Sequence, residues 1–368
     1  MSKYMRRRSA RGTFIGLTGK CRNWDLSAVT RLRHTVWREV KPGIEGQPVM
    51  GIGFIGAKQT TIRREIILTG TGVHSGAPVS IVLHPADADT GIRFLITKGN
   101  EVQAEIPADV HAVTNVTLCT VLSDKNGASV STVEHLLAAL RGLCVDNVYV
   151  EIDSGEVPIM DGSSAPFVEA IDEVGIRELG SPRKYIKVLK PIRVDEGDCW
   201  GELSPHSGFH FDVEIDFDSK FIGRQRLAVE MTPGVFRSEI SRARTFGFMK
   251  DVEQLWAAGL ALGASLDNSV AIGDDRIMNP EGLRFDNEFV RHKTLDAVGD
   301  LALAGAPLLA SFKSVRGGHR LNSLVVKALL ADKTAWTTVS APRVRDTIHA
   351  DADLPLSAAA ANFAADRS

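Results

Sequence analysis

Three side chains that can bind metal ions or protons recur at four-residue intervals in the segment 289–300. His292, Asp296 and Asp300 would lie on one face of a helix, because residues four apart are neighbours on a helix surface. A histidine and a carboxylate one turn apart can bind a divalent metal ion from one side. The same spacing also fits an ordinary His–Asp ion pair on a solvated face, so this segment alone leaves both interpretations open.

A further histidine, His135, directly follows Glu134 in a leucine-rich segment. Successive helical residues point about 100° apart, so His135 can bind a metal ion while Glu134 reaches a water molecule on it. Catalytic zinc sites keep three protein ligands and leave one position for such a water. Zinc lowers the pKa of the bound water toward about 7, and a nearby carboxylate can accept the proton of this water. A histidine satisfied within a leucine-rich core is the alternative.

The fourth candidate is His319, which follows Gly317 and Gly318. Two glycines allow the backbone to bring this imidazole close to a reacting group. Amide hydrolysis needs a proton for the leaving nitrogen and positive charge near the oxyanion, and a protonated histidine can supply either. Asp300 would favour the charged imidazole if the two residues meet. A surface histidine after a turn is the alternative.

Four helices are expected to position these residues. Residues 130–143 carry apolar side chains at helical spacing, with Thr132 as the predicted N-cap. Residues 286–304 and 321–334 form two more predicted helices. Another begins at Ser163 or Ser164, beside Pro166, and reaches about residue 173.

Strands are expected in both halves of the chain, at 60–68, 79–83, 147–152, 185–188, 192–194, 200–203 and 209–217. Residues 180–184 are predicted to be a linker. The expected domains are 58–181 and 185–341, the latter with an apolar insert at about 245–283. Strands together with helices in each half indicate an α+β fold and not a doubly wound parallel sheet.

The first 58 residues differ from the rest in charge. They hold twelve Lys and Arg against Asp25, Glu39 and Glu45, about +9, which leaves about −11 for the remainder. We interpret residues 1–57 as a poorly ordered basic extension, or as a mis-assigned start before Met50. An arm that contacts nucleic acid or a membrane surface is the alternative. The tail 342–368 is expected to fray.

Composition excludes several classes of protein. The net charge of −2 gives no reason to expect a nucleic-acid partner, and no apolar run approaches the roughly 20 residues of a membrane span. The cysteines are widely spread and form no CxxC pair, which argues against a disulfide framework or a thiolate zinc site. A cytoplasmic protein is therefore expected, with any metal site built from histidines and carboxylates.

Five motifs occur in an order that resembles the UDP-3-O-acyl-N-acetylglucosamine deacetylases, zinc enzymes of lipid A synthesis. The similarity covers about residues 58 to 340. The motifs are Ser-Thr-Val-Glu-His-Leu (131–136), Pro-Ile-Met-Asp-Gly-Ser (158–163), Ser-Arg-Ala-Arg-Thr-Phe-Gly-Phe (241–248), Phe-Val-Arg-His-Lys-Thr-Leu-Asp (289–296) and Gly-His (318–319).

The resemblance implies a role for each matching residue. Zinc would be bound by His135, His292 and Asp296, with Glu134 as general base and His319 as general acid or oxyanion-stabilising cation. Thr245 would hydrogen-bond the oxyanion, and Asp300 would support His319. The implied substrate contacts are Lys293 at the polar head, Phe246 at the acyl passage, Phe217 and Arg316 on either side of the uracil, Cys119 near the metal and His74 near the sugar.

The resemblance also implies a particular fold. It consists of two similar domains, each a sheet backed by two helices, packed helix layer to helix layer in a β-α-α-β sandwich with zinc between them. The expected protein is a monomer that acts on a small UDP-linked acyl amino sugar, with transient membrane-surface contact left open.

Two other functions stay open at this stage. A non-catalytic, metal-stabilised module for nucleotide sugars would need a closed coordination shell and would tolerate loss of Glu134 and His319. A zinc amidase acting on another amino sugar, such as one of the cell wall, would not depend on the acyl chain.

Overall fold

The computed structural model describes residues 56–99 and 101–340 of the 368-residue chain. These described residues belong to one compact unit. The predicted basic extension up to residue 55 and the predicted tail 342–368 lie outside the described residues. Among the residues that are described, no helix is both long and apolar enough to cross a membrane.

A five-stranded sheet is built from the first half of the described chain. Its order is β2-β3-β9-β4-β5, with β4 and β9 parallel and the other neighbours antiparallel. In β3 the alternate residues Val79, Ile81 and Leu83 are buried, as expected for a sheet with one face on the core. The strands are β2 (Ile66–Thr71), β3 (Pro78–Pro85), β4 (Ile92–Lys98), β5 (Glu101–Pro107) and β9 (Val148–Ile152).

A seven-stranded sheet is built from the second half. β18 lies at its centre, antiparallel to β13 and parallel to both β11 and β14. The strands are β11 (Lys184–Val188), β12 (Ile192–Glu196), β13 (Cys199–Pro205), β14 (Phe209–Asp216), β15 (Arg224–Glu230), β18 (Leu308–Val315) and β19 (Trp336–Ser340).

Three small sheets complete the strand pairing of the described residues. They pair β1 (Lys58–Ile62) with β10 (Ile176–Pro182), β6 (Val113–Asn115) with β7 (Val121–Ser123) and β8 (Ser129–Val130), and β16 (Phe246–Phe248) with β17 (Val270–Ile272).

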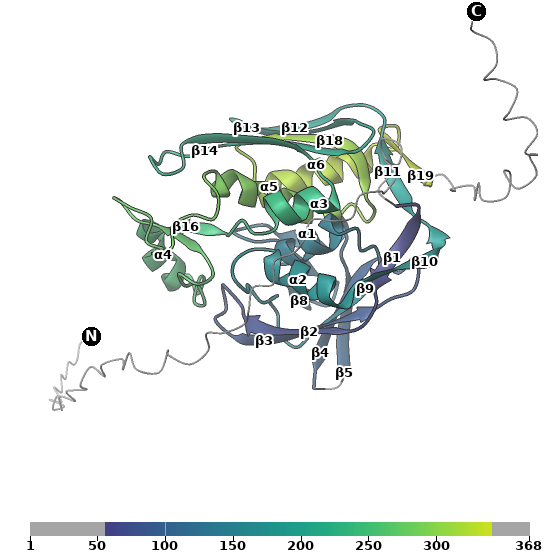
Figure 1. Ribbon diagram of the computed structural model, residues 1–368, viewed down its shortest axis with the longest axis horizontal. Coiled ribbons are helices and arrows are strands. Elements are labelled where there is room, and N and C mark those ends of the chain that lie inside the picture. Colours follow the sequence, from purple (N-terminus) through teal and green to yellow (C-terminus); the bar gives the residue numbers. More distant parts are fainter. Residues whose placement is uncertain (1–55, 100, 341–368) are drawn as a thin grey trace, which may run out of the picture. The chain divides into compact units, whose positions relative to one another are not determined.

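Four longer helices lie between the two large sheets, as Figure 1 shows. One continuous hydrophobic core includes residues from both sheets and from all four helices. The fold is therefore of the mixed α+β class, as predicted. The helices are α1 (Glu134–Gly142), α2 (Ala165–Val174), α5 (Glu288–Ala302) and α6 (His319–Ala331), with short turns α3 (Pro233–Val235), α4 (Val252–Ala257), η1 (Val110–Ala112), η2 (Phe236–Ile240) and η3 (Met249–Asp251).

Helix α1 is buried along its whole length and packs closely against α5. A Cβ atom added at Gly299 of α5 would lie 2.0 Å from the carbonyl oxygen of Glu134. Glycine is therefore needed at this crossing. Every residue of α1 is buried, which explains why this helix is apolar on most sides.

Of the predicted N-terminal caps of α1 and α2, the cap of α2 is confirmed and the cap of α1 is wrong. Helix α2 has Ser164 as its N-cap and Pro166 in its first turn, as predicted. The predicted N-cap of α1, Thr132, is wrong: its φ of 58° is left-handed, and its hydroxyl donates to Glu156 Oε1. Helix α1 begins only at Glu134, with Val133 as its N-cap.

Two predictions about strands and linkers are also wrong. Residues 60–68 do not form one strand, because the chain leaves β10 as a partner at Ile62 and pairs with β3 from Ile66 onward. Residues 180–184 are not a free linker, since β10 extends to Pro182 and β11 begins at Lys184.

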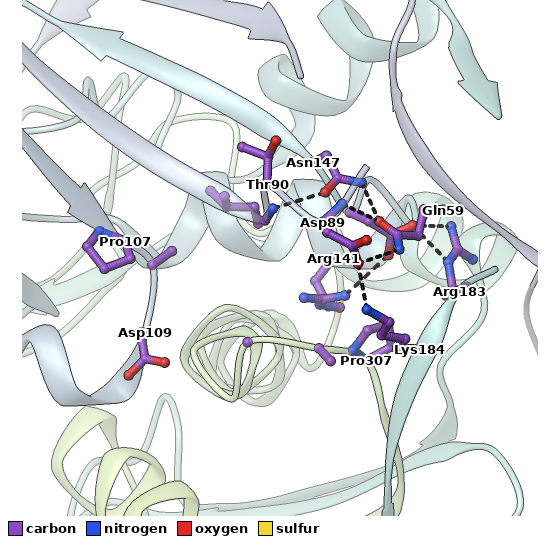
Figure 2. A pocket seen from close by; sticks show the side chains of 16 residues that line it. Gln59, Asp89, Thr90, Pro107, Asp109, Arg141, Asn147, Arg183, Lys184 and Pro307 are labelled. Atoms are coloured by element: carbon purple, nitrogen blue, oxygen red, sulfur yellow. Dashed lines mark hydrogen bonds and ion pairs between the residues drawn. The ribbon is translucent and has the colours of Figure 1, made fainter. Parts of the chain in front are cut away.

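Polar contacts hold the connection between β10 and β11, where the chain passes from its first half to its second (Figure 2). Arg183 Nε donates to Asp146 Oδ2 at 2.9 Å, and Lys184 Nζ donates to Asp89 Oδ1 at 2.7 Å. Gln59 Nε2 donates to the Pro182 carbonyl at 3.2 Å. A pocket of about 260 Å³ is lined by residues that include Gln59, Asp89, Asp146, Arg183 and Lys184.

Candidate active site

Helices α1 and α5 bring the three predicted metal ligands together. The ligand atoms of His135, His292 and Asp296 all lie within 4.8 Å of one another, and all three residues are buried. Asp296 Oδ1 is 3.6 Å from His135 Nε2 and 3.3 Å from His292 Nε2. The ligand set therefore combines one helix from each half of the chain.

The chemistry of these atoms fits a divalent metal ion. His292 Nδ1 lies 3.1 Å from the Ala243 carbonyl, an arrangement that leaves Nε2 free to bind a metal. Burial lowers the pKa of His292 to about 4, so its imidazole is neutral at neutral pH. Among residues 56–99 and 101–340, Asp296 Oδ1 and His135 Nδ1 are buried without a hydrogen-bond partner. A metal ion would satisfy Asp296 Oδ1.

Asp296 is held in its charged form. Burial alone would raise its pKa, but His292 and Lys293 outweigh burial and hold the pKa of Asp296 well below its usual range. Lys293 Nζ donates to Asp296 Oδ2 at 2.9 Å. Burial likewise opposes the charge on Lys293, but Asp296 raises the pKa of this ammonium above its ordinary value.

Glu134 lies beside the candidate ligands and is not part of their cluster. Its Oε2 accepts a hydrogen bond from the backbone N–H of Thr120 at 3.1 Å. Burial raises the pKa of Glu134 above its ordinary value, although His319 and His135 oppose the shift. A carboxylate with a raised pKa is suited to accept a proton near neutral pH.

His319, at the first position of α6, faces the same site. Its Nδ1 lies 2.9 Å from Asp300 Oδ2, so the predicted His–Asp contact is present. Its Nε2 lies 3.9 Å from both Glu134 Oε1 and Asp296 Oδ2. Burial lowers the pKa of His319, but Asp300 and Glu134 outweigh burial and raise it to about 9. The imidazole is therefore protonated at neutral pH.

Aromatic side chains line one side of His292. The ring of Phe246 contacts His292, with ring centroids 6.2 Å apart. Phe246 also contacts Phe289, with ring centroids 5.0 Å apart. Phe217 packs on Phe246 at 5.7 Å. Thr245 lies in the same segment, between Phe246 and the Ala243 carbonyl near His292, and its backbone N–H donates to the Gly162 carbonyl at 2.8 Å.

The remaining predicted site residues are Arg316, Cys119 and His74. Arg316 follows β18 as Phe217 follows the parallel β14, and the Arg316 N–H donates to the Glu214 carbonyl. Burial and the charge of Glu134 raise the pKa of the Cys119 thiol to about 12, so this buried thiol is unreactive at neutral pH.

Among the described residues, the hydrogen bonds of the His74 backbone go to Glu156 and Leu262 and not to the candidate metal ligands. Its backbone N–H donates to Glu156 Oε1 at 2.8 Å, and its carbonyl accepts a hydrogen bond from Leu262 N–H at 3.1 Å. The turn that contains His74 is therefore attached to the insert that follows β16.

Sequence reasoning missed two residues that contact Asp300. Thr120 Oγ1 donates to Asp300 Oδ1 at 2.7 Å, and Asn322 Nδ2 donates to Asp300 Oδ2 at 2.9 Å. Asn322 lies three residues after His319 on α6, a spacing that places both on one helix face. That spacing was the available signal for Asn322, whereas nothing in the sequence links Thr120 to Asp300.

Comparison with known proteins gives a consistent family. Residues 59–331 match the LpxC family, described as UDP-3-O-acyl N-acetylglycosamine deacetylase. The chain is 56% identical over 286 residues to a Brucella ovis protein named UDP-3-O-acyl-N-acetylglucosamine deacetylase, covering 77% of this chain and 99% of that protein. Relatives of the same name from Brucella canis and Brucella melitensis give the same identity and coverage. The chain belongs to the LpxC family of UDP-3-O-acyl-N-acetylglucosamine deacetylases.

Proposed function

We propose that this chain hydrolyses the acetamide of UDP-3-O-acyl-N-acetylglucosamine, giving the free amine and acetate, in the committed step of lipid A biosynthesis. One observation carries the proposal. In a member of this family, three buried metal-ligand candidates, a carboxylate and a charged His–Asp pair converge on one site.

We further propose zinc as the metal. Two imidazole nitrogens and one carboxylate oxygen make up the three-ligand set of a catalytic zinc site. A zinc ion held there would polarise the amide carbonyl and lower the pKa of a water molecule.

Glu134 and His319 are the proposed base and acid. Glu134 Oε1 would accept the proton of the attacking water, because its other oxygen is already hydrogen-bonded to Thr120. His319 Nε2 faces the same space, 3.9 Å from Glu134 Oε1. It would stabilise the oxyanion or donate its proton to the leaving nitrogen. Asp300 holds the imidazole by Nδ1 and keeps it charged.

The other predicted residues are proposed to orient the substrate. The Thr245 hydroxyl would donate to the oxyanion, and Lys293 would contact the polar head. Phe246 and the insert at about 245–283 would form the acyl passage, which the aromatic cluster beside His292 supports. The ends of the parallel strands β14 and β18 support the pairing of Phe217 with Arg316 around the uracil. Cys119 near the metal and His74 near the sugar stay proposals.

We also propose that residues 58–181 and 185–341 are two similar domains, each with a sheet and two helices. The arrangement of Figure 1 supports this proposal, with the four longer helices between the sheets. The monomeric state, the cytoplasmic location and any transient contact with a membrane surface stay predictions.

Metal analysis combined with an activity assay tests the proposed function. The purified protein should contain about one zinc ion per chain and release acetate from the UDP-linked acyl sugar. Removing the 3-O-acyl chain from the substrate should lower kcat/KM. A zinc-containing protein that releases no acetate would contradict the activity, and equal rates with and without the acyl chain would contradict the substrate.

A further inference from the structure

Thr120 contacts two carboxylates of the candidate active site, those of Glu134 and Asp300, although it lies on neither helix that carries them. It is buried, with 1% of its surface exposed, immediately before β7. Two residues earlier, Leu118 has a φ of 66°, a conformation that costs energy for a residue other than glycine. The segment 118–120 therefore holds an unusual backbone conformation where it meets the site.

Two hydrogen bonds connect Thr120 to the site. Its backbone N–H donates to Glu134 Oε2 at 3.1 Å, and its hydroxyl donates to Asp300 Oδ1 at 2.7 Å. The second contact joins residues 180 positions apart in the sequence. One residue thus binds the proposed base and the partner of the proposed acid.

Together with His319, these contacts form a closed ring of four residues. Thr120 binds one oxygen of each carboxylate, and His319 faces the other oxygen of each. His319 Nδ1 is 2.9 Å from Asp300 Oδ2, and its Nε2 is 3.9 Å from Glu134 Oε1. Hydrogen bonds therefore hold both oxygens of Asp300, whereas Glu134 is held by a hydrogen bond at Oε2 and has His319 Nε2 within ion-pair distance of Oε1.

We infer that Thr120 is a positioning residue that keeps Glu134, Asp300 and, through Asp300, His319 in one fixed arrangement. The inference rests on the proposed function. Buried carboxylates need hydrogen-bond donors, and the position of each donor decides how the carboxylate is turned. Asn322 also donates to Asp300, but to Oδ2. Of the two residues, only Thr120 also reaches Glu134.

Thr120→Val tests this role because it removes the hydroxyl and keeps the backbone N–H. We expect kcat to fall by about 10-fold to 100-fold, the usual cost of losing a partner that orients an active-site ligand. KM should stay within about twofold, because Thr120 is not proposed to touch the substrate. Zinc content should not change, since neither hydrogen bond involves a metal ligand. Thr120→Ser restores the hydroxyl and should recover most of kcat.

Thr61→Val is the matched control. Thr61 is also a fully buried threonine, and its hydroxyl accepts a hydrogen bond from the Ala86 N–H at 3.0 Å, away from the site. Its kcat should equal that of the wild type. If Thr120→Val does not fold, Thr120→Ala removes the same hydroxyl without placing a methyl group beside the carboxylate.

A double-mutant cycle separates positioning from a general loss of structure. In an Asp300→Ala background the Thr120 hydroxyl has lost its acceptor, so Thr120→Val should lower kcat by less than about twofold. An equal loss with and without Asp300, or a wild-type kcat for Thr120→Val, would overturn the inference. A wild-type protein that releases no acetate would instead contradict the proposed function itself.

Discussion

Glu134 and His135 are consecutive residues to which we assign different roles at one site. His135 faces His292 and Asp296, whereas Glu134 faces Thr120 and His319. Both can face protein groups because α1 is buried on all sides. The difference of about 100° between successive helical residues explains why one can bind the metal while the other handles protons.

Replacing Glu134 should therefore separate metal binding from catalysis. Glu134→Ala removes the base and no ligand, so the variant should retain zinc and lose about 10²-fold to 10⁴-fold in kcat. Metal content and acetate release should be measured on the same preparation, with Glu134→Gln as the variant closest in shape. Loss of zinc from a folded variant would contradict the proposed roles.

His319 should make the stability of the metal-free protein depend on pH. Its folded-state pKa of about 9 lies above the ordinary value of 6.5. The stabilisation that its charged form contributes is therefore complete below about pH 6.5 and is lost as the pH rises through about 9. Urea unfolding of metal-free wild type and His319→Gln should give a difference in free energy that shrinks over this range. A difference that grows with pH would contradict the assignment.

Much of the candidate site could be predicted at the residue scale. The spacing of His292, Asp296 and Asp300, with the pair Glu134-His135, indicated one site, and the structure brings these residues together. The roles of Thr120 and the Ala243 carbonyl could not be predicted. They depend on contacts between segments 180 and 49 residues apart, which no local pattern encodes.

At the scale of elements, the close crossing of α1 and α5 determines the geometry of the site. Both helices were predicted, because each has apolar side chains at helical spacing. The central strand β18 was not predicted, because Leu309, Ser314 and Val315 interrupt the alternation of apolar and polar residues in its sequence. The start of α1 was misplaced because the conformation of Thr132 depends on Glu156.

Gly299→Ala should disturb this crossing. The new Cβ would meet the Glu134 carbonyl oxygen at 2.0 Å, so the helices must move apart. We expect a loss of about 1–3 kcal/mol in unfolding free energy from overpacking, reduced by alanine's better helix propensity. The kcat of the folded variant should also fall, by more than the loss of unfolding free energy alone explains, because Glu134 moves.

Gly180→Ala is the control for Gly299→Ala. No atom lies within 4 Å of a Cβ added at Gly180. Chemical unfolding and acetate release should be compared for both variants. Wild-type activity in Gly299→Ala would show that the crossing does not determine the position of Glu134.

At the scale of the whole molecule, the candidate metal ligands come from both halves of the described chain. His135 comes from α1, and His292 and Asp296 come from α5. A metal ion bound only by the folded state adds stability that grows with its concentration, about 4 kcal/mol at a thousandfold excess over Kd.

Removing the metal should therefore lower the thermal stability of the whole protein. A chelator should decrease Tm, and added zinc should restore it. His135→Ala is the control, because a protein that has lost a ligand should show a much smaller chelator effect. An equal decrease in both proteins would mean that the chelator acts elsewhere.

The position of β18 in the chain has a consequence for synthesis on the ribosome. The central strand of the second sheet ends at Val315, and α6, which carries His319, follows it directly. Strands β11, β13 and β14 must therefore wait for residues 308–315 before they can pair with it. An interrupted translation product that stops before this point contains all three candidate metal ligands but neither the central strand nor the proposed acid. With His319 as the proposed acid, hydrolysis is expected to begin only when nearly all of the described chain has been made.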